Sequence, residues 1–160
     1  MGFESLISNI GHFLTVMFTA MVPVVELKGA IPIGLGLGLD VWETYLAALI
    51  GSCVPAPFLM FFIRALLRWM EGCSISALRR FCEFLNKKIE KGQQNRFFDG
   101  SVMFGLFLFV AIPLPSTGVW TGSMIAGVLR LDKRKAIPIV FLGNAVAGLI
   151  VLMMSHLIIA

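Results

Sequence analysis

The fold of this chain is decided by the stretch PVVELKGAIP at residues 23–32. Two charges, Glu26 and Lys28, stand here inside otherwise unbroken hydrophobic sequence, and ionisable side chains are costly to bury in a membrane. A proline at each end and Gly29 between them interrupt helices, which predicts a turn between two half-helices. The position of this turn relative to a bilayer therefore governs the interpretation of the whole sequence.

Hydrophobic residues dominate the composition. They make up 58% of the 160 residues, charged residues make up only 14%, and the mean hydropathy is +0.92. These values are typical of a small all-α integral membrane protein with a single membrane domain. The N-terminus lacks a basic region and a cleavage site, so the first segment is expected to remain in the mature protein. The net charge of +4 predicts orientation in the membrane rather than a nucleic-acid partner.

The lengths of the apolar segments distinguish spans from shorter limbs, because a helix needs about 20 residues to cross the hydrocarbon core. Residues 44–67 and 136–160 are long enough, and residues 6–25 are about long enough. The limbs at residues 30–39 and 119–129 are too short to cross alone, as is the limb that precedes the second proline turn.

The same order of features occurs in both halves: a limb, a proline turn, a short limb, a charged loop and a full span. The matches that support this comparison are Pro23 with Pro113, Gly29 and Gly38 with Gly118 and Gly127, Leu39-Asp40 with Leu131-Asp132, and Gly51-Ser52 with Gly143-Asn144. A re-entrant hairpin plus one span crosses the membrane an odd number of times, so the two copies would be inverted, as in secondary transporters. We expect repeats at residues 1–70 and 100–160.

The linker at residues 71–99 has a different character. Apolar residues recur there at spacings of three and four with Lys and Arg between them: Ile75, Leu78, Phe81, Leu85 and Ile89. This spacing predicts an amphipathic helix on a membrane face. A loop helix packed on the protein's own core fits the same spacing.

Charge gives an orientation. If both hairpins re-enter, the linker and residues 130–135 share one side, which then holds every Lys and Arg except Lys28. The positive-inside rule makes that side, and the linker, cytoplasmic in a bacterial or archaeal inner membrane, with both termini outside. In a competing topology, residues 6–25 and 101–115 span fully and the proline motifs are surface turns. That topology must either bury Asp40 and Glu43 in the membrane or leave spans of about eleven residues, which are too short to cross it.

The two turns form a candidate substrate-binding site. Half-helices that begin near Gly29 and Gly118 would direct free N–H groups toward the protein centre, where they attract an anion. Lys28 adds a positive charge, and hydroxyl donors come from Ser116, Thr117 and Thr121. This set of groups suits a phosphate or a carboxylate.

Glu26 has three interpretations. It pairs with Lys28, it takes up a proton as part of coupling because burial favours the neutral form of a carboxyl group, or it holds a cationic substrate. Arg64 and Arg130 end membrane segments, which favours a role as snorkelling interface anchors, although either could also attract an anionic head group at the cytoplasmic mouth. The sequence shows no hydrolase, phosphate-loop or metal motif, so no enzyme activity, cofactor or metal is expected.

The strings VELKGAIPIG at residues 25–34 and AIPLPSTGVWTG at residues 111–122 resemble the small multidrug export protein family. More distantly, the second half is similar to the DedA/VTT membrane protein superfamily, in which a proline-led turn precedes an Ala-Gly pair and a basic loop, here Ala126-Gly127 and residues 130–135. This resemblance implies inverted re-entrant hairpins, an acidic residue at the place of Glu26, and movement of polyprenyl phosphate or other phospholipids between leaflets. Those relatives usually carry an arginine after the proline of the second hairpin. Here Ser116, Thr117 and Gly118 occupy that place, so Lys28 would have to supply the charge from the opposite hairpin.

The sequence therefore favours a small secondary transporter of an anionic, phosphate-bearing lipid such as polyprenyl phosphate, with Lys28 in the anion site and Glu26 as the proton-linked group. The alternatives are an exporter of cationic amphiphiles, with Glu26 as counter-charge, and a non-transporting scaffold that recruits a partner through residues 74–91. Membrane lipids and a small amphiphilic substrate are the expected partners. The small size leaves little protein to shield a polar path, which favours a homodimer.

Overall fold

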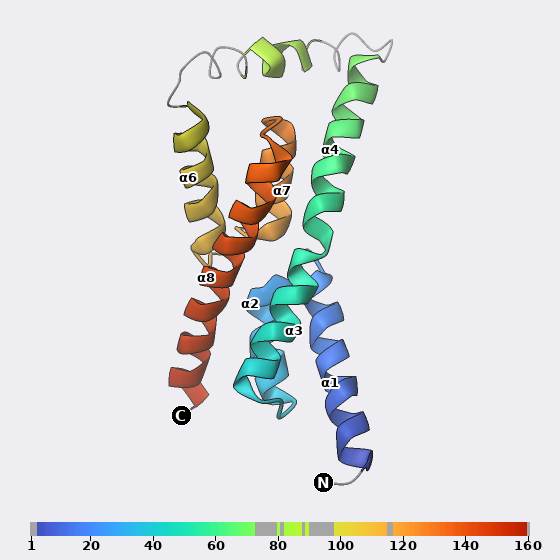
Figure 1. Ribbon diagram of the computed structural model, residues 1–160, viewed down its shortest axis with the longest axis vertical. Coiled ribbons are helices and arrows are strands. Elements are labelled where there is room, and N and C mark those ends of the chain that lie inside the picture. Colours follow the sequence, from blue (N-terminus) through green and yellow to red (C-terminus); the bar gives the residue numbers. More distant parts are fainter. Residues whose placement is uncertain are drawn as a thin grey trace.

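The computed structural model describes residues 3–72, 80, 82–87, 89, 98–114 and 117–159. Secondary structure within these ranges is entirely helical, which confirms the predicted all-α class (Figure 1). The helices are α1 (Phe3–Met21), α2 (Glu26–Gly36), α3 (Val41–Cys53), α4 (Pro55–Glu71), α6 (Phe98–Ala111), α7 (Val119–Val128) and α8 (Lys133–Ile159).

Two helical stretches are long and apolar enough to cross a membrane. α3 and α4 continue one another through Val54 and form the stretch Val41–Glu71, and α8 contains the second, Lys133–Ser155. Only 39% and 33% of their most apolar windows are buried, so most of this surface faces outward. Phe58 and Met153 are among the large apolar side chains exposed there. An apolar surface of this extent marks contact with lipid or with another protein.

Each half of the chain forms a helical hairpin beside one part of a long helix. α1 and α2 pack against each other and against α3, whereas α6 and α7 pack against α8 (Figure 1). The first hairpin turns at residues 22–25, and the second turns between Ile112 and Gly118. The two turns meet at mid-height in the molecule (Figure 1).

Two hydrophobic cores follow this division. The first is built by α1, α2 and α3 and receives Leu152 from the far half of α8. The second is built by α6, α7 and the beginning of α8, and it receives Ala56 and Met60 from α4. Each hairpin thus packs both on its own long helix and on the far half of the other one.

The predicted turn between two helices lies at residues 22–25, but both charges lie in the helix that follows it rather than in the turn. Glu26 is the first residue of α2, Lys28 lies in its first helical turn, and Pro32 lies inside the helix. Pro32 cannot donate to the carbonyl group of Lys28, but α2 packs on both α1 and α3, and this packing compensates for the lost bond. The second limb begins at Val119, directly after Gly118, as the sequence predicts.

α2 and α7 end in the same type of turn. Gly38 has φ 80° and Arg130 has φ 53°. The N–H groups of the next residues, Leu39 and Leu131, bond back into the last turn of their helices, which is the pattern of a Schellman cap. The sequence comparison pairs Gly38 with Gly127. The backbone instead gives Arg130 the equivalent conformation.

The long helices also begin alike. Asp40 accepts a hydrogen bond from the backbone N–H of Trp42, and Asp132 accepts one from that of Arg134, both at 3.0 Å. An aspartate in this position satisfies a free N–H group of the first helical turn. α3 and α8 therefore start with matching caps.

Glycines allow the first limb of each hairpin to approach its long helix closely. A Cβ atom on Gly51 would lie 2.0 Å from the backbone oxygen of Met17 in α1. A Cβ atom on Gly143 would lie 2.9 Å from the backbone oxygen of Phe107 in α6. The two glycines that the sequence comparison pairs thus have the same role in packing.

The neighbouring residues join the two long helices. Asn144 Nδ2 of α8 donates a 2.6 Å hydrogen bond to Ser52 Oγ of α3, and both residues are buried. A buried side-chain pair of this kind fixes the relative position of two helices, because separating it would leave polar groups unsatisfied.

Part of the predicted linker helix is described. Residues 82–87 are helical, and Cys82 and Ile89 are buried. Cys82 Sγ lies 3.9 Å from the carbonyl oxygen of Leu67, and Asn86 Nδ2 donates to Glu71 Oε1 at 3.0 Å. This part of the linker therefore packs on the end of α4. The predicted apolar positions Ile75, Leu78 and Phe81 lie outside the described residues.

Candidate substrate-binding site

A cavity of about 430 Å³ lies between the two hairpin turns. This turn cavity is lined by Glu26, Lys28 and Gly29 from the first hairpin and by Leu114 and Thr121 from the second. The folding of the two halves therefore brings Glu26 and Lys28 to the same cavity as the second proline turn.

Glu26 reaches across to the second hairpin. Its side-chain Oε1 accepts a 3.0 Å hydrogen bond from the backbone N–H of Trp120, in the first turn of α7. The residue is only 8% exposed and has φ 49°. A Cβ atom on Gly118 would lie 1.8 Å from Glu26 Oε2, so the glycine makes room for the carboxylate. Glu26 thus acts as a cap for α7 from a distant part of the chain.

This contact changes the predicted anion site. The sequence predicts that the N-terminus of α7 is available to an anionic substrate. In the structure the carboxylate of Glu26 bonds there, where the helix dipole favours a negative charge. An anion reaches the N–H group of Trp120 only if Glu26 moves.

Lys28 also bonds to the second hairpin. Its Nζ donates to the carbonyl oxygen of Leu114 at 2.7 Å and to Thr117 Oγ1 at 3.2 Å. Thr117 Oγ1 also lies 2.7 Å from the carbonyl oxygen of Ile112. Because a hydroxyl group has a single proton, the geometry favours a role for Thr117 in holding the turn together. Its predicted contact with substrate stays a prediction.

Trp120 completes the contacts between the hairpins. Its indole Nε1 donates to the carbonyl oxygen of Met21, at the end of α1, at 3.1 Å. With the one bond of Glu26 and the two bonds of Lys28, this gives four cross-hairpin bonds beside the turn cavity. The sequence does not reveal these partners of Trp120, because Met21 and Glu26 lie in the other half of the chain.

The other predicted site residues have different positions. Gly29 lies inside α2 and lines the turn cavity, as does Thr121 from α7. Gly118 contacts Glu26 rather than the cavity wall. Ser116 lies outside the described residues. In the part of the chain that the structure describes, no three His, Cys, Asp or Glu side chains are grouped so that they could hold a metal ion.

Comparison with known proteins gives a match at the level of a family. The family model described as "Putative small multi-drug export protein" matches residues 26–150. The match begins at Glu26 and includes both limbs of the second hairpin and most of α8. No curated protein and no solved structure matches the chain.

Proposed function

The chain belongs to the small multidrug export protein family, and from this premise we propose that it is a membrane transporter whose substrate path passes through the turn cavity. The family description names export, and the two long apolar helices support a membrane protein. The observation that carries the proposal is that Glu26 and Lys28, at the wall of one cavity, each bond to the opposite hairpin.

In the proposed membrane arrangement, α1–α2 and α6–α7 are re-entrant hairpins of an inverted repeat. The stretch Val41–Glu71 has 31 residues, or about 46 Å of helix, which exceeds the roughly 30 Å hydrocarbon core. The first hairpin packs on α3 and the second limb of the other packs on α4, so both turns lie near the middle of this helix. The end that carries residues 130–135 is cytoplasmic, and both termini are outside.

The proposed substrate is an anionic, phosphate-bearing amphiphile such as a polyprenyl phosphate. Glu26 is buried, whereas Lys28 is only half-buried, so a ligand that enters the turn cavity meets the ammonium group first. The N-terminus of α7 compensates the charge of Glu26. The similarity to the DedA/VTT superfamily implies the same class of substrate and stays a prediction.

Coupling to protons follows from the bonds of the two charged groups. Protonation of Glu26 removes the negative charge that the N-terminus of α7 favours, so the bond from the N–H group of Trp120 becomes weaker. An anion bound by Lys28 competes with the carbonyl oxygen of Leu114. Both events weaken bonds between the hairpins, so each favours a rearrangement of one half against the other.

The second candidate function is export of cationic amphiphiles, which the family description favours. In this case Glu26 is the counter-charge of the substrate and leaves the N-terminus of α7 to bind it. The two candidates differ in which of the two charged residues binds the ligand.

Ligand binding to the purified protein tests the proposal. The signal is tryptophan fluorescence, to which Trp120 beside the turn cavity contributes. We expect Lys28→Ala to raise the Kd for a short-chain prenyl phosphate about tenfold or more, because a charge-assisted hydrogen bond contributes roughly 1.5–3 kcal/mol. Lys87→Ala, which removes an exposed charge from the linker, is the matched control.

The outcomes separate the candidates. If Lys28→Ala and Thr117→Val both leave the Kd for the prenyl phosphate unchanged, the anionic substrate is wrong. If a quaternary ammonium amphiphile binds instead and Glu26→Gln abolishes that binding, the second candidate is correct.

A further inference from the structure

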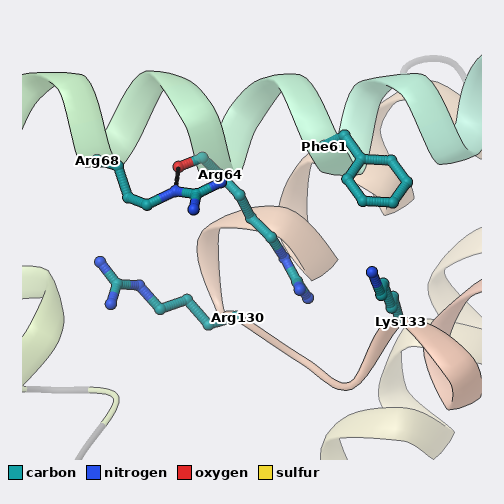
Figure 2. A pocket seen from close by; sticks show the side chains of 5 residues that line it. All are labelled: Phe61, Arg64, Arg68, Arg130 and Lys133. Carbon is teal, nitrogen blue, oxygen red and sulfur yellow. Dashed lines mark hydrogen bonds between the residues drawn. The ribbon is translucent and has the colours of Figure 1, made fainter.

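A second cavity, of about 330 Å³, lies between α4 and the turn from α7 to α8. Four basic side chains and one aromatic ring line this basic pocket: Arg64, Arg68 and Phe61 from α4, Arg130 from the turn and Lys133 from α8 (Figure 2). α7 separates it from the turn cavity, because the cavity lies at the first residues of this helix and the pocket follows its last.

Protein contacts hold the basic side chains in the pocket. Arg64 Nη2 donates to the carbonyl oxygen of Leu131, and Arg68 Nε donates to that of Arg64 at 3.4 Å. Lys133 Nζ lies 4.7 Å from the centre of the Phe61 ring, a cation–π contact. Figure 2 shows the Arg64 side chain extending from α4 toward Lys133, with Arg68 folded back along α4 and Arg130 on the other side of the pocket. The charges therefore come from three parts of the chain.

Arg64 has unused hydrogen-bonding capacity. Its Nε is buried and has no hydrogen-bond partner among the described residues. A buried donor without a partner is costly, and a ligand that accepts hydrogen bonds would satisfy it. The guanidinium group is the side chain best suited to bind two oxygens of one phosphate.

A single carboxylate compensates part of the positive charge. Glu71 forms a salt bridge with Arg130. Glu71 also accepts a hydrogen bond from Asn86 Nδ2 at 3.0 Å. Four converging cations repel one another, and this carboxylate offsets one of them. A bound anion would relieve the remaining repulsion.

Arg130 has an unfavourable backbone conformation. Its φ of 53° lies in the left-handed region, where the equivalent turn of the first half has Gly38. A large side chain in this region is strained, and such residues cluster at functional sites. The conformation directs the Arg130 side chain to the pocket that Arg64, Arg68 and Lys133 also line.

We propose that the basic pocket binds the phosphate group of an anionic ligand. Arg64 and Arg130 bind the phosphate oxygens, and Arg68 and Lys133 add charge. The phosphate belongs either to a lipid head group, for which the exposed ring of Phe61 provides an apolar neighbour, or to free inorganic phosphate. This binding site does not depend on the proposed transport function.

Calorimetric titration of the full chain in a neutral detergent tests this site, with inorganic phosphate in one arm and dihexanoyl phosphatidic acid in the other. Lys133→Gln and Lys135→Gln form a matched pair, since both remove an exposed charge from the first turn of α8 but only Lys133 lines the pocket. Arg130→Gly is a second variant that suits the left-handed turn and so is expected to fold.

We expect Lys133→Gln and Arg130→Gly to raise the Kd about tenfold or more, and Lys135→Gln to change it less than about twofold. Similar affinity in both arms identifies free phosphate as a ligand, and binding of the lipid alone identifies a head group; both support the proposal. No saturable binding in either arm, or an equal effect of Lys135→Gln, would overturn it.

Repeating the titrations in the Lys28→Ala protein assigns the signal to one of the two cavities. Binding that persists belongs to the basic pocket, even if the proposed transport function is wrong. Binding that disappears belongs to the turn cavity and overturns the proposal for the basic pocket.

Discussion

Glu26 and Arg130 are the non-glycine residues with positive φ in the described part of the chain. Glu26 uses this conformation to begin α2 while its carboxylate bonds to the N-terminus of α7. Arg130 uses it to end α7 while its side chain lines the basic pocket. The sequence drew attention to Glu26 because a charge is rare in apolar sequence. It gave no sign of the backbone conformation of Arg130, which depends on the turn that surrounds it.

A substitution at Gly118 tests the contact between Glu26 and the N-terminus of α7. We expect Gly118→Ala to lower the free energy of unfolding by about 2 kcal/mol or more, because the new methyl group displaces Glu26 and leaves a buried carboxylate without its N–H partner. Chemical unfolding in detergent measures the loss. Gly105→Ala in α6, where a Cβ atom meets nothing within 4 Å, is the control. An equal effect of both substitutions would contradict the role assigned to Gly118.

The helices of the two halves have matching caps and matching contacts. Asp40 and Asp132 begin the long helices, and Gly51 and Gly143 admit α1 and α6 to their surfaces. The order of elements was predictable from segment lengths, since turns and charged loops limit each apolar run. The start of α2 at Glu26 was not predictable. Pro32 suggests a helix break, but the packing of α2 on α1 and α3 overrides it.

The two glycines of the long helices test this packing. We expect Gly51→Ala to lower the free energy of unfolding by about 2–3 kcal/mol, since its methyl group would overlap the backbone of α1. Gly143→Ala should cost less, because Phe107 O is farther away than Met17 O is from Gly51. Chemical unfolding gives both values.

Gly11→Ala in α1 is the control for these substitutions, because a Cβ atom there meets nothing within 4 Å. We expect no loss of stability from it, since alanine has the higher helix propensity. If Gly51→Ala leaves the free energy of unfolding unchanged, α1 packs less closely on α3 than the structure shows.

The whole molecule consists of two hairpins whose turns meet between two long helices (Figure 1). This arrangement gives the turn cavity one wall from each half, and four hydrogen bonds join the halves beside it. A site between two halves can open or close when these move against each other, which is the property that a transporter needs.

Cysteine labelling tests the proposed position of the first turn in the membrane. Val24 is 92% exposed in the protein and Trp42 is 63% exposed. In a variant whose native cysteines are serines, we expect Val24→Cys to react slowly with a membrane-impermeant maleimide from either side. Trp42→Cys should react quickly from outside, and Lys135→Cys quickly from the cytoplasmic side.

The competing topology predicts a different labelling pattern. If the proline motifs are surface turns, Val24→Cys reacts as quickly as Lys135→Cys and from the side opposite to Trp42→Cys. That result would remove the re-entrant arrangement while leaving the contacts between the two turns unchanged.

The sequence by itself determined the helical class, the two long apolar segments and the two proline turns, because hydropathy and helix-breaking residues act locally. It could not assign partners to the charges. Glu26 bonds to Trp120 and Lys28 bonds to Leu114 only because the two hairpins meet. Likewise, Arg64 and Arg130 stand far apart in the sequence, and only the packing of α4 on α7 brings them to one pocket. Contacts between distant residues depend on how the helices pack, which local sequence does not specify.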